Sequence, residues 1–305
     1  MHPIRALLVY LAAVFGGAAT LAPWVHRAVQ HLAPDSSIAH QPFHRYVSRC
    51  LLFLALLGLF PLVRALGIRS AAALGWILPT REPRRLVIGL VLGFASLALA
   101  AAVPVIAGIR EWHPQGTASV VARHIINGAV SAVVVSILEE LLFRGAVFGA
   151  LRRAHGAAIA VVGSAVLYSV VHFFDRPGTP PFVDAWTGWT TLGAMLHGFT
   201  QWDRVFPGFL TLAVAGGILA WIRERTGSLT VGIGLHAGWI FWLKSFGALT
   251  RGLPGPSGAA FWGSAKLYDG WPACGILIGV ALIVFGATRS TPPNPGPETK
   301  PDHAA

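Results

Sequence analysis

Apolar runs close to the length of a membrane-spanning helix occupy most of this chain. Eight such runs follow one another, over residues 4–23, 47–66, 86–108, 119–151, 156–174, 206–222, 228–249 and 270–287. A helix needs about 20 mostly apolar residues to span the hydrocarbon core of a bilayer. We therefore predict an all-α, polytopic membrane protein with about eight transmembrane helices. Only 11% of the residues are charged, against about 25% in soluble domains, which excludes an ordinary soluble enzyme.

The apolar runs divide the chain into four parts. Residues 1–118 hold three predicted helices with their loops, 119–249 a central core, and 250–290 one further helix. The Pro-rich, polar tail 291–305 is predicted to be disordered. The fourth run, 119–151, would be about 50 Å long, so we expect it to tilt or to extend beyond the lipid. The first run also fits a cleaved signal peptide, but seven further runs behind it favour an uncleaved helix.

The formal net charge of +11 comes almost entirely from arginines that stand singly or in pairs between the apolar runs. Nucleic-acid-binding proteins gather such charge in a patch, so we expect no nucleic-acid partner. In membrane proteins, Lys and Arg are enriched in cytoplasmic loops. If both termini lie inside, the cytoplasmic loops carry Arg64, Arg69, Arg81, Arg84, Arg85, Arg152, Arg153, Arg223 and Arg225. This moderate bias favours a multi-pass protein with both termini in the cytoplasm.

Two acidic residues interrupt the fourth run near its middle. Glu139 and Glu140 lie in the segment VVVSILEELLFRGAVFGAL. Ionisable groups at that depth are costly unless they are paired or hydrated, so they indicate a functional site. Arg144 stands four residues after Glu140 and is predicted to pair with it, while Glu139 is rotated by about 100° and stays free for chemistry. The alternative is that all three form a structural polar cluster that only fixes helix packing.

Two histidines lie deep in later apolar runs. His172 ends the fifth run in AVLYSVVHFF, and His236 lies within the seventh in VGIGLHAGWIFW. Each alone is more simply a hydrogen-bonded packing residue. Together with the glutamates, they supply the carboxylate and imidazole groups that a catalytic zinc site or a general-base site requires. The remaining histidines are weaker candidates, because most lie in loops or at helix ends: His26, His31, His40, His44, His113, His124, His155 and His197.

Two glycine pairs accompany these polar residues. Gly145 and Gly149 follow the glutamates, and Gly234 and Gly238 flank the second histidine at the same four-residue spacing. Such spacing permits close helix packing, so the two helices that bear the polar groups can approach each other. Counting along the spans, however, separates the two histidines by about 12 Å in depth. A tilted or later-starting fifth helix would remove that difference.

At these residues the sequence resembles the CAAX-protease and bacteriocin-processing (CPBP) family of intramembrane proteases, the relatives of the CAAX prenyl endopeptidase. The family pattern is EExxxR, then FxxxH, then HxxxN, on separate membrane helices. Here the pattern reads Glu139, Glu140 and Arg144, then Tyr168 and His172, then His236 and Ile240. Tyr168 thus replaces the family's Phe, and Ile240 replaces its Asn. The resemblance covers about residues 119–245 and implies an eight-helix protease in which the first Glu and both His are essential.

The resemblance and the residue types together define the expected catalytic residues, Glu139, Glu140, His172 and His236. Glu139 would act as the general base that takes a proton from the attacking water. His172 would position that water, and His236 would stabilise the oxyanion or ligate a metal. Glu140, paired with Arg144, would orient the helix. Glu139, His172 and His236 also match the three protein ligands of a catalytic zinc, so Zn²⁺ is a candidate cofactor and metal-free hydrolysis the alternative.

We expect a membrane-anchored or lipid-modified protein or peptide as substrate, and a location in the cytoplasmic membrane of a bacterium. Two hypotheses from other classes remain. A non-catalytic membrane scaffold or immunity protein would keep the fold, and the missing Asn at Ile240 slightly favours it. A transporter that uses Glu139, Glu140 and Arg144 as an ion or proton relay would also explain intramembrane carboxylates. The sequence shows no inverted repeat to support transport.

Overall fold

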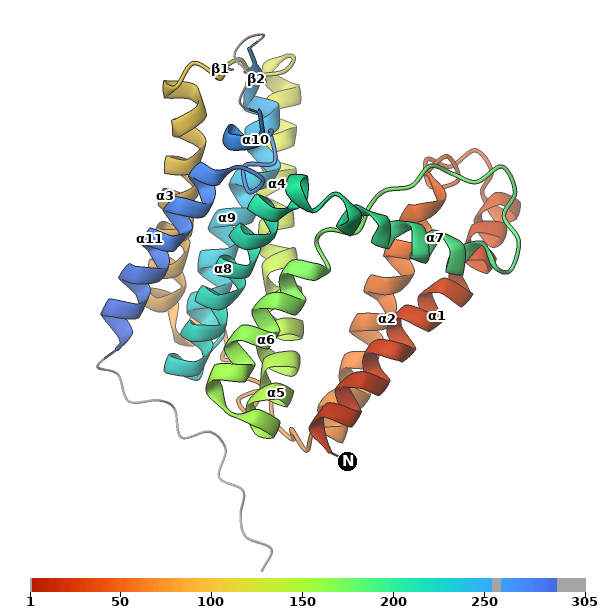
Figure 1. The fold of residues 1–305 in the computed structure, drawn as a ribbon, viewed down its shortest axis with the longest axis horizontal. Helices are drawn as coiled ribbons and strands as arrows, with labels where there is room; N and C mark the ends of the chain where they lie inside the picture. The colour runs from red at the N-terminus through yellow and green to blue at the C-terminus, as the bar shows by residue number, and fades with distance from the viewer. Residues whose placement is uncertain (1, 254–258, 290–305) are drawn as a thin grey trace, which may run out of the picture.

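The structure is a computed structural model, which describes residues 2–253 and 259–289. Its long helices are α1 (Pro3–Leu32), α2 (Phe43–Ala65), α3 (Pro83–Ile106), α4 (Ala118–Glu139), α8 (Trp202–Thr226), α9 (Thr230–Leu249) and α11 (Trp271–Thr288). The shorter elements are η1 (Pro79–Arg81), η2 (Glu140–Val147), α5 (Phe148–His155), α6 (Ala157–Val170), α7 (Thr187–Met195), η3 (Leu196–Thr200) and α10 (Ala259–Trp262), with the strands β1 (Arg110–Trp112) and β2 (Thr250–Gly252). The predicted all-α, polytopic class is confirmed (Figure 1).

Six helical segments in the described part of the chain are long and apolar enough to cross a membrane. They are α1, α2, α3, the continuous segment Ala118–His155, α8 and α11. Two of the eight predicted runs, which correspond to α6 and α9, are not among these six. α6 has only 14 residues, fewer than a full span requires. α9 has 20 residues, but His236 and Lys244 make it less apolar, and much of it is buried among other helices.

α9 crosses α3 so closely that only glycine fits at the contact. A Cβ at Gly234 would lie 2.2 Å from the Leu86 carbonyl oxygen, and Gly238 meets the backbone of the same helix. The helices that bear the glutamates and His236 do lie close together, as the spacing permits, but Gly234 and Gly238 do not form that contact. Gly145 likewise faces Leu74 rather than α9. Gly234 and Gly238 allow α9 to pack directly against the α3 backbone, and this packing fixes the position of the helix that carries His236.

α1 and α2 pair side by side and form an N-terminal arm that leans away from the main bundle (Figure 1). The continuous segment Ala118–His155, made of α4, η2 and α5, is called the central helix below. At one end of the arm, Leu7 and Tyr10 of α1 share a buried apolar cluster with Ala146 and Ala150 of the central helix. At the other end, α7 lies against α1, with Gly188 close to the α1 backbone. The arm is thus fixed at both ends, with space for a cavity between them.

The main core lies where α3, α8, α9 and α11 meet, around Leu97, Leu219, Leu235 and Leu277. The β1–β2 pair closes one end of this bundle (Figure 1). The N-terminus of α1, the α5–α6 turn and the end of α11 lie at the opposite end. This common end is the one that the sequence predicts to face the cytoplasm. The tail 291–305, predicted to be disordered, lies outside the described residues.

Candidate active site

The central helix changes its winding at the two glutamates. α4 ends at Glu139, and the next eight residues form the π-helical segment η2 before α5 continues. π-helical turns are rare and occur frequently at functional sites. Hydrophobic periodicity predicted one continuous α-helix here, because apolar spacing does not distinguish a π-helical turn from an α-helical one. The change of winding sets the directions of Glu139, Glu140 and Arg144.

Glu139 lies between the two histidines. Its Oε2 atom is 3.8 Å from His172 Nε2 and 3.6 Å from His236 Nε2. The depth difference expected from span counting is absent, because α6 ends at Val170 and His172 lies in the turn that follows. About a quarter of the Glu139 and His172 side chains is exposed, whereas His236 is buried. The structure therefore brings together one carboxylate and two imidazoles from three separate helical segments.

Glu140 is turned away from Glu139 and is fully buried. Its Oε1 atom is 3.1 Å from Arg144 Nη1 and also 3.1 Å from His236 Nδ1. Arg144 in turn lies over the Tyr168 ring, with the guanidinium carbon 4.4 Å from the ring centroid. The Glu140–Arg144 pair was expected from the sequence, but the contact to His236 was not. Glu140 thus connects the central helix to the histidine of α9.

The hydrogen-bond partners assign the same tautomer to both imidazoles. The Tyr168 carbonyl oxygen can only accept, so His172 Nδ1, 2.7 Å away, carries the proton and donates it. His236 Nδ1 likewise donates to the Glu140 carboxylate. With both rings neutral, the Nε2 lone pair of His172 faces Glu139, whereas Nε2 of His236 also lies 3.2 Å from the Tyr168 hydroxyl. The Oε2 atom of Glu139 has no hydrogen-bond donor among the described residues. The Glu139 oxygen and the His172 nitrogen are two acceptors that face each other, which suits a donor between them, and a water molecule supplies two hydrogens.

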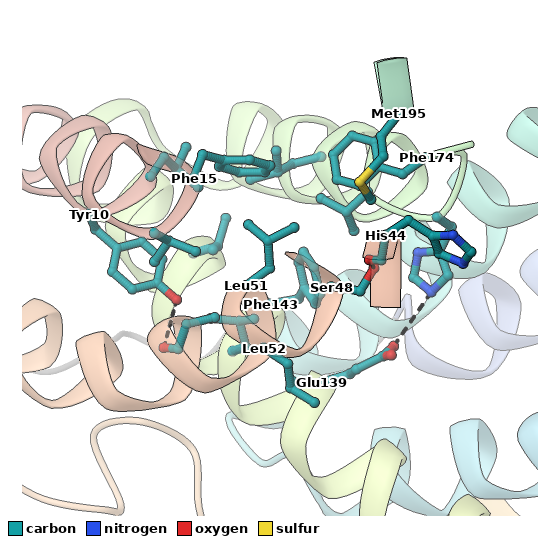
Figure 2. A pocket seen from close by; sticks show the side chains of 18 of the residues that line it. Tyr10, Phe15, His44, Ser48, Leu51, Leu52, Glu139, Phe143, Phe174 and Met195 are labelled. Carbon is teal, nitrogen blue, oxygen red and sulfur yellow. Dashed lines mark hydrogen bonds and ion pairs between the residues drawn. The ribbon is translucent and has the colours of Figure 1, made fainter. Parts of the chain in front are cut away.

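A cavity of about 540 Å³ opens onto Glu139 and His172 (Figure 2). The N-terminal arm supplies one wall, and the central helix and the end of α6 supply the other. The wall of the arm is mostly apolar and includes Tyr10, Leu11, Val14, Phe15, Leu51 and Leu52. Polar side chains of His44, Arg45, Ser48, Asp175 and Arg176 line another part. An apolar chain can therefore lie beside the free carboxylate.

Sequence reasoning missed several residues of this site. His44 was set aside as one of several loop histidines, yet it lines the cavity and its Nδ1 atom is 2.8 Å from the Pro177 carbonyl oxygen. Tyr168 was noted only as a replacement within a motif, yet its hydroxyl is 3.2 Å from His236 Nε2. The tyrosine carried a signal, because a hydroxyl in an apolar helix needs a partner. The arm residues carried none, since apolar side chains look alike in every span.

Glu139, His172 and His236 are the expected ligands of a zinc ion. Two imidazole nitrogens and a carboxylate oxygen are the ligand types that a catalytic zinc takes. However, within residues 2–253 and 259–289, no group of three or more His, Cys, Asp or Glu side chains has the spacing of a metal site. Glu139, His172 and His236 would have to move closer to hold an ion. No reaction step is therefore assigned to a metal.

Fold and site together define an integral, multi-pass membrane protein with a carboxylate–imidazole site at the wall of a cavity. Residues 121–242 match the family model described as type II CAAX prenyl endopeptidase Rce1-like. All three motifs, from Glu139 to Ile240, lie within that match. Over these residues the chain is similar to the CAAX protease (CPBP) family of intramembrane proteases. No curated protein and no solved structure gives a significant match to the chain.

Proposed function

We propose that the protein is an endopeptidase that hydrolyses a peptide bond in a membrane-anchored or lipid-modified protein, in the cytoplasmic membrane of a bacterium. The observation that carries this proposal is the position of Glu139 Oε2 within 3.8 Å of both His172 Nε2 and His236 Nε2. Similarity to the CAAX protease family supports the same reaction class. The apolar wall of the adjoining cavity supports a substrate with an apolar chain.

Glu139 is the general base in this proposal. Its carboxylate takes one proton from a water molecule while the water oxygen attacks the carbonyl carbon of the scissile peptide bond. The Nε2 lone pair of His172 accepts a hydrogen bond from the same water and orients it. A new C–O bond forms, and the carbonyl oxygen becomes an oxyanion. Collapse of this intermediate breaks the C–N bond, and the proton from Glu139 goes to the leaving nitrogen.

His236 completes the site from the side opposite His172. Its Nε2 atom is 3.6 Å from Glu139 Oε2. When its Nε2 takes up a further proton from water in the cavity, His236 stabilises the oxyanion, and the adjacent Glu140 carboxylate offsets the imidazolium charge. Arg144 neutralises Glu140 when His236 is uncharged. Glu140 is thus proposed to act through His236.

Cleavage of a lipid-anchored peptide tests the proposal. The purified protein is reconstituted in liposomes with a peptide that carries a farnesylated cysteine, and products are identified by mass spectrometry. We expect hydrolysis at one bond, and a loss of about 100-fold or more in H172Q and H236Q. The same peptide without its lipid should be cleaved more slowly. No cleavage of any prenylated, acylated or unmodified membrane peptide would contradict the proposal and favour a scaffold.

Transport is separated from proteolysis by a second measurement on the same liposomes. An ion or proton relay through Glu139, Glu140 and Arg144 would carry a flux that pH-sensitive and cation-sensitive dyes detect. We expect no flux above that of empty liposomes. A flux that E139Q abolishes would favour the transporter.

Zinc binding by Glu139, His172 and His236 is a separate proposal, with the three side chains closing around the ion. Elemental analysis of the purified protein tests it. One zinc per chain in the wild type, and none in H172Q or H236Q, would support a metalloprotease. Full activity after dialysis against a chelator, with no zinc remaining, would contradict it.

A further inference from the structure

The chain departs from the family motifs at two positions that lie on either side of His236. Tyr168 stands where the pattern has Phe, and Ile240 where it has Asn. One departure adds a polar group to the site, and the other removes one. The structure shows what each replacement contacts.

Ile240 offers the site no polar group. It is buried in a small apolar cluster with Ala132 and Ala237, against α4. It lies one turn after His236 on α9, so a side chain at position 240 is a neighbour of His236 on the helix surface. An Asn at this position would place an amide beside the imidazole. In this chain, that source of a hydrogen bond is lost.

Tyr168 supplies a hydrogen bond from the opposite side. Its hydroxyl is 3.2 Å from His236 Nε2, and because Nδ1 of that ring donates to Glu140, Nε2 is the acceptor and the tyrosine O–H the donor. The same residue accepts the Nδ1–H of His172 through its carbonyl oxygen at 2.7 Å. Its ring also lies 4.5 Å from the His172 ring, centroid to centroid.

The surroundings of Tyr168 restrict it to this role. It is almost fully buried and does not line the large cavity, so its hydroxyl meets His236 rather than substrate. It lines instead a small cavity of about 30 Å³ behind His236, which it shares with Tyr268. Arg144, packed on its ring, holds the tyrosine in place. Tyr168 is therefore a positioning residue.

We infer that the Tyr168 hydroxyl compensates for the missing motif asparagine, by fixing the ring of His236 and its tautomer from the α6 side. One tyrosine then sets both imidazoles, His172 through its carbonyl and His236 through its hydroxyl. This inference rests on the proposed function, because it assigns a role within that hydrolytic site. It makes the two departures from the motif a coupled pair.

The coupling is tested with the liposome cleavage assay and three variants, Y168F, I240N and the double variant Y168F/I240N. We expect Y168F to lower kcat about five- to tenfold with KM little changed, the scale of one lost hydrogen bond. The double variant carries the motif residues at both positions, and we expect it to recover most of that loss. Wild-type kcat in Y168F, or a double variant no faster than Y168F, would overturn the inference.

A second measurement needs no substrate, so it separates failure of this inference from failure of the proposed function. The protein is labelled with ¹⁵N-histidine in detergent micelles, and the His236 signals are assigned by their loss in H236Q. In Y168F, we expect the Nε2 signal of His236 to move towards that of an unbonded imidazole nitrogen, while His172 is unchanged. Y268F makes the same chemical change in the same small cavity and should leave His236 unaltered. An unchanged His236 signal in Y168F would overturn the inference.

Discussion

At the scale of single residues, two adjacent carboxylates have different surroundings. Glu140 is buried and contacts both Arg144 and His236, so its charge is neutralised and its position fixed. Glu139 is partly exposed at a cavity and faces the two imidazole nitrogens at distances above 3.5 Å. A buried charge is retained only when it is paired. The pairing of Glu140 therefore leaves Glu139 as the carboxylate available for chemistry.

The space for the Glu140 carboxylate depends on a glycine of α9. A Cβ at Gly232 would lie 2.9 Å from Glu140 Oε2, closer than two such atoms pack. We expect G232A to displace the carboxylate from His236, to lower the free energy of unfolding by about 1–3 kcal/mol, and to reduce cleavage. Thermal unfolding in detergent and the liposome assay measure both effects.

Gly217 of α8 is the matched control, because no atom lies within 4 Å of a Cβ at that position. G217A should be neutral or slightly stabilising, since Ala favours a helix over Gly by about 0.5–1 kcal/mol. If G232A behaves like G217A in both stability and activity, this result would contradict the close packing of Glu140 against Gly232.

At the scale of elements, a polar contact joins the start of α3 to the turn between α8 and α9. The Ser228 hydroxyl donates to Glu82 Oε2 at 2.7 Å, and Arg85 pairs with the same carboxylate. Burial raises the pKa of Glu82, but hydrogen bonds from Ser228 and Thr230 and the charge of Arg85 outweigh it and hold the pKa below its ordinary value. The junction positions the start of α9, the helix that carries His236.

This lowered pKa makes the junction sensitive to acid. Because the folded-state pKa is below the unfolded one, the stabilisation by Glu82 is complete above the ordinary carboxyl pKa of about 4.3 and is lost as the pH falls through the lowered value. We expect E82Q to lower the Tm at pH 7. The difference in Tm between wild type and E82Q should shrink as the pH falls below 4.

Glu111 provides the comparison for E82Q, since it forms an exposed ion pair with Arg251 between β1 and β2. Exposed pairs contribute little to stability, so E111Q should have a smaller effect at pH 7. A wild-type Tm advantage over E82Q that does not change between pH 7 and pH 3 would contradict the assigned role of Glu82.

At the scale of the whole molecule, the site depends on the N-terminal arm standing apart from the bundle. The arm supplies the apolar wall of the cavity, and the central helix supplies Glu139 (Figure 2). We expect L11W, which adds bulk to this wall, to reduce cleavage of a lipid-anchored peptide at least tenfold, because a site must admit the substrate to act on it.

Leu8 lies on the same helix and is largely exposed, away from the cavity. L8W therefore makes the same change outside the cavity and should keep near-wild-type kcat/KM. Equal activity in L11W and L8W would show that substrate does not pass through this cavity.

The sequence was sufficient to predict the fold class, because apolar runs of this length commonly form α-helices in a bilayer. It was also sufficient to select Glu139, Glu140, Arg144, His172 and His236, since polar groups within such runs are rare. It was not sufficient for the π-helical turn or for the cavity wall. Both depend on how helices pack in three dimensions, and apolar side chains of the arm resemble those that face lipid.

The most direct test of the central claim is the cleavage rate of E139Q relative to wild type in the liposome assay. This substitution keeps the shape of the side chain beside His172 and His236 and removes its ability to accept a proton. We expect cleavage to fall by at least about 100-fold with thermal stability retained, while E111Q, the same change in strand β1 away from the site, stays active. Cleavage by E139Q at the wild-type rate would contradict the assignment of Glu139 as the general base.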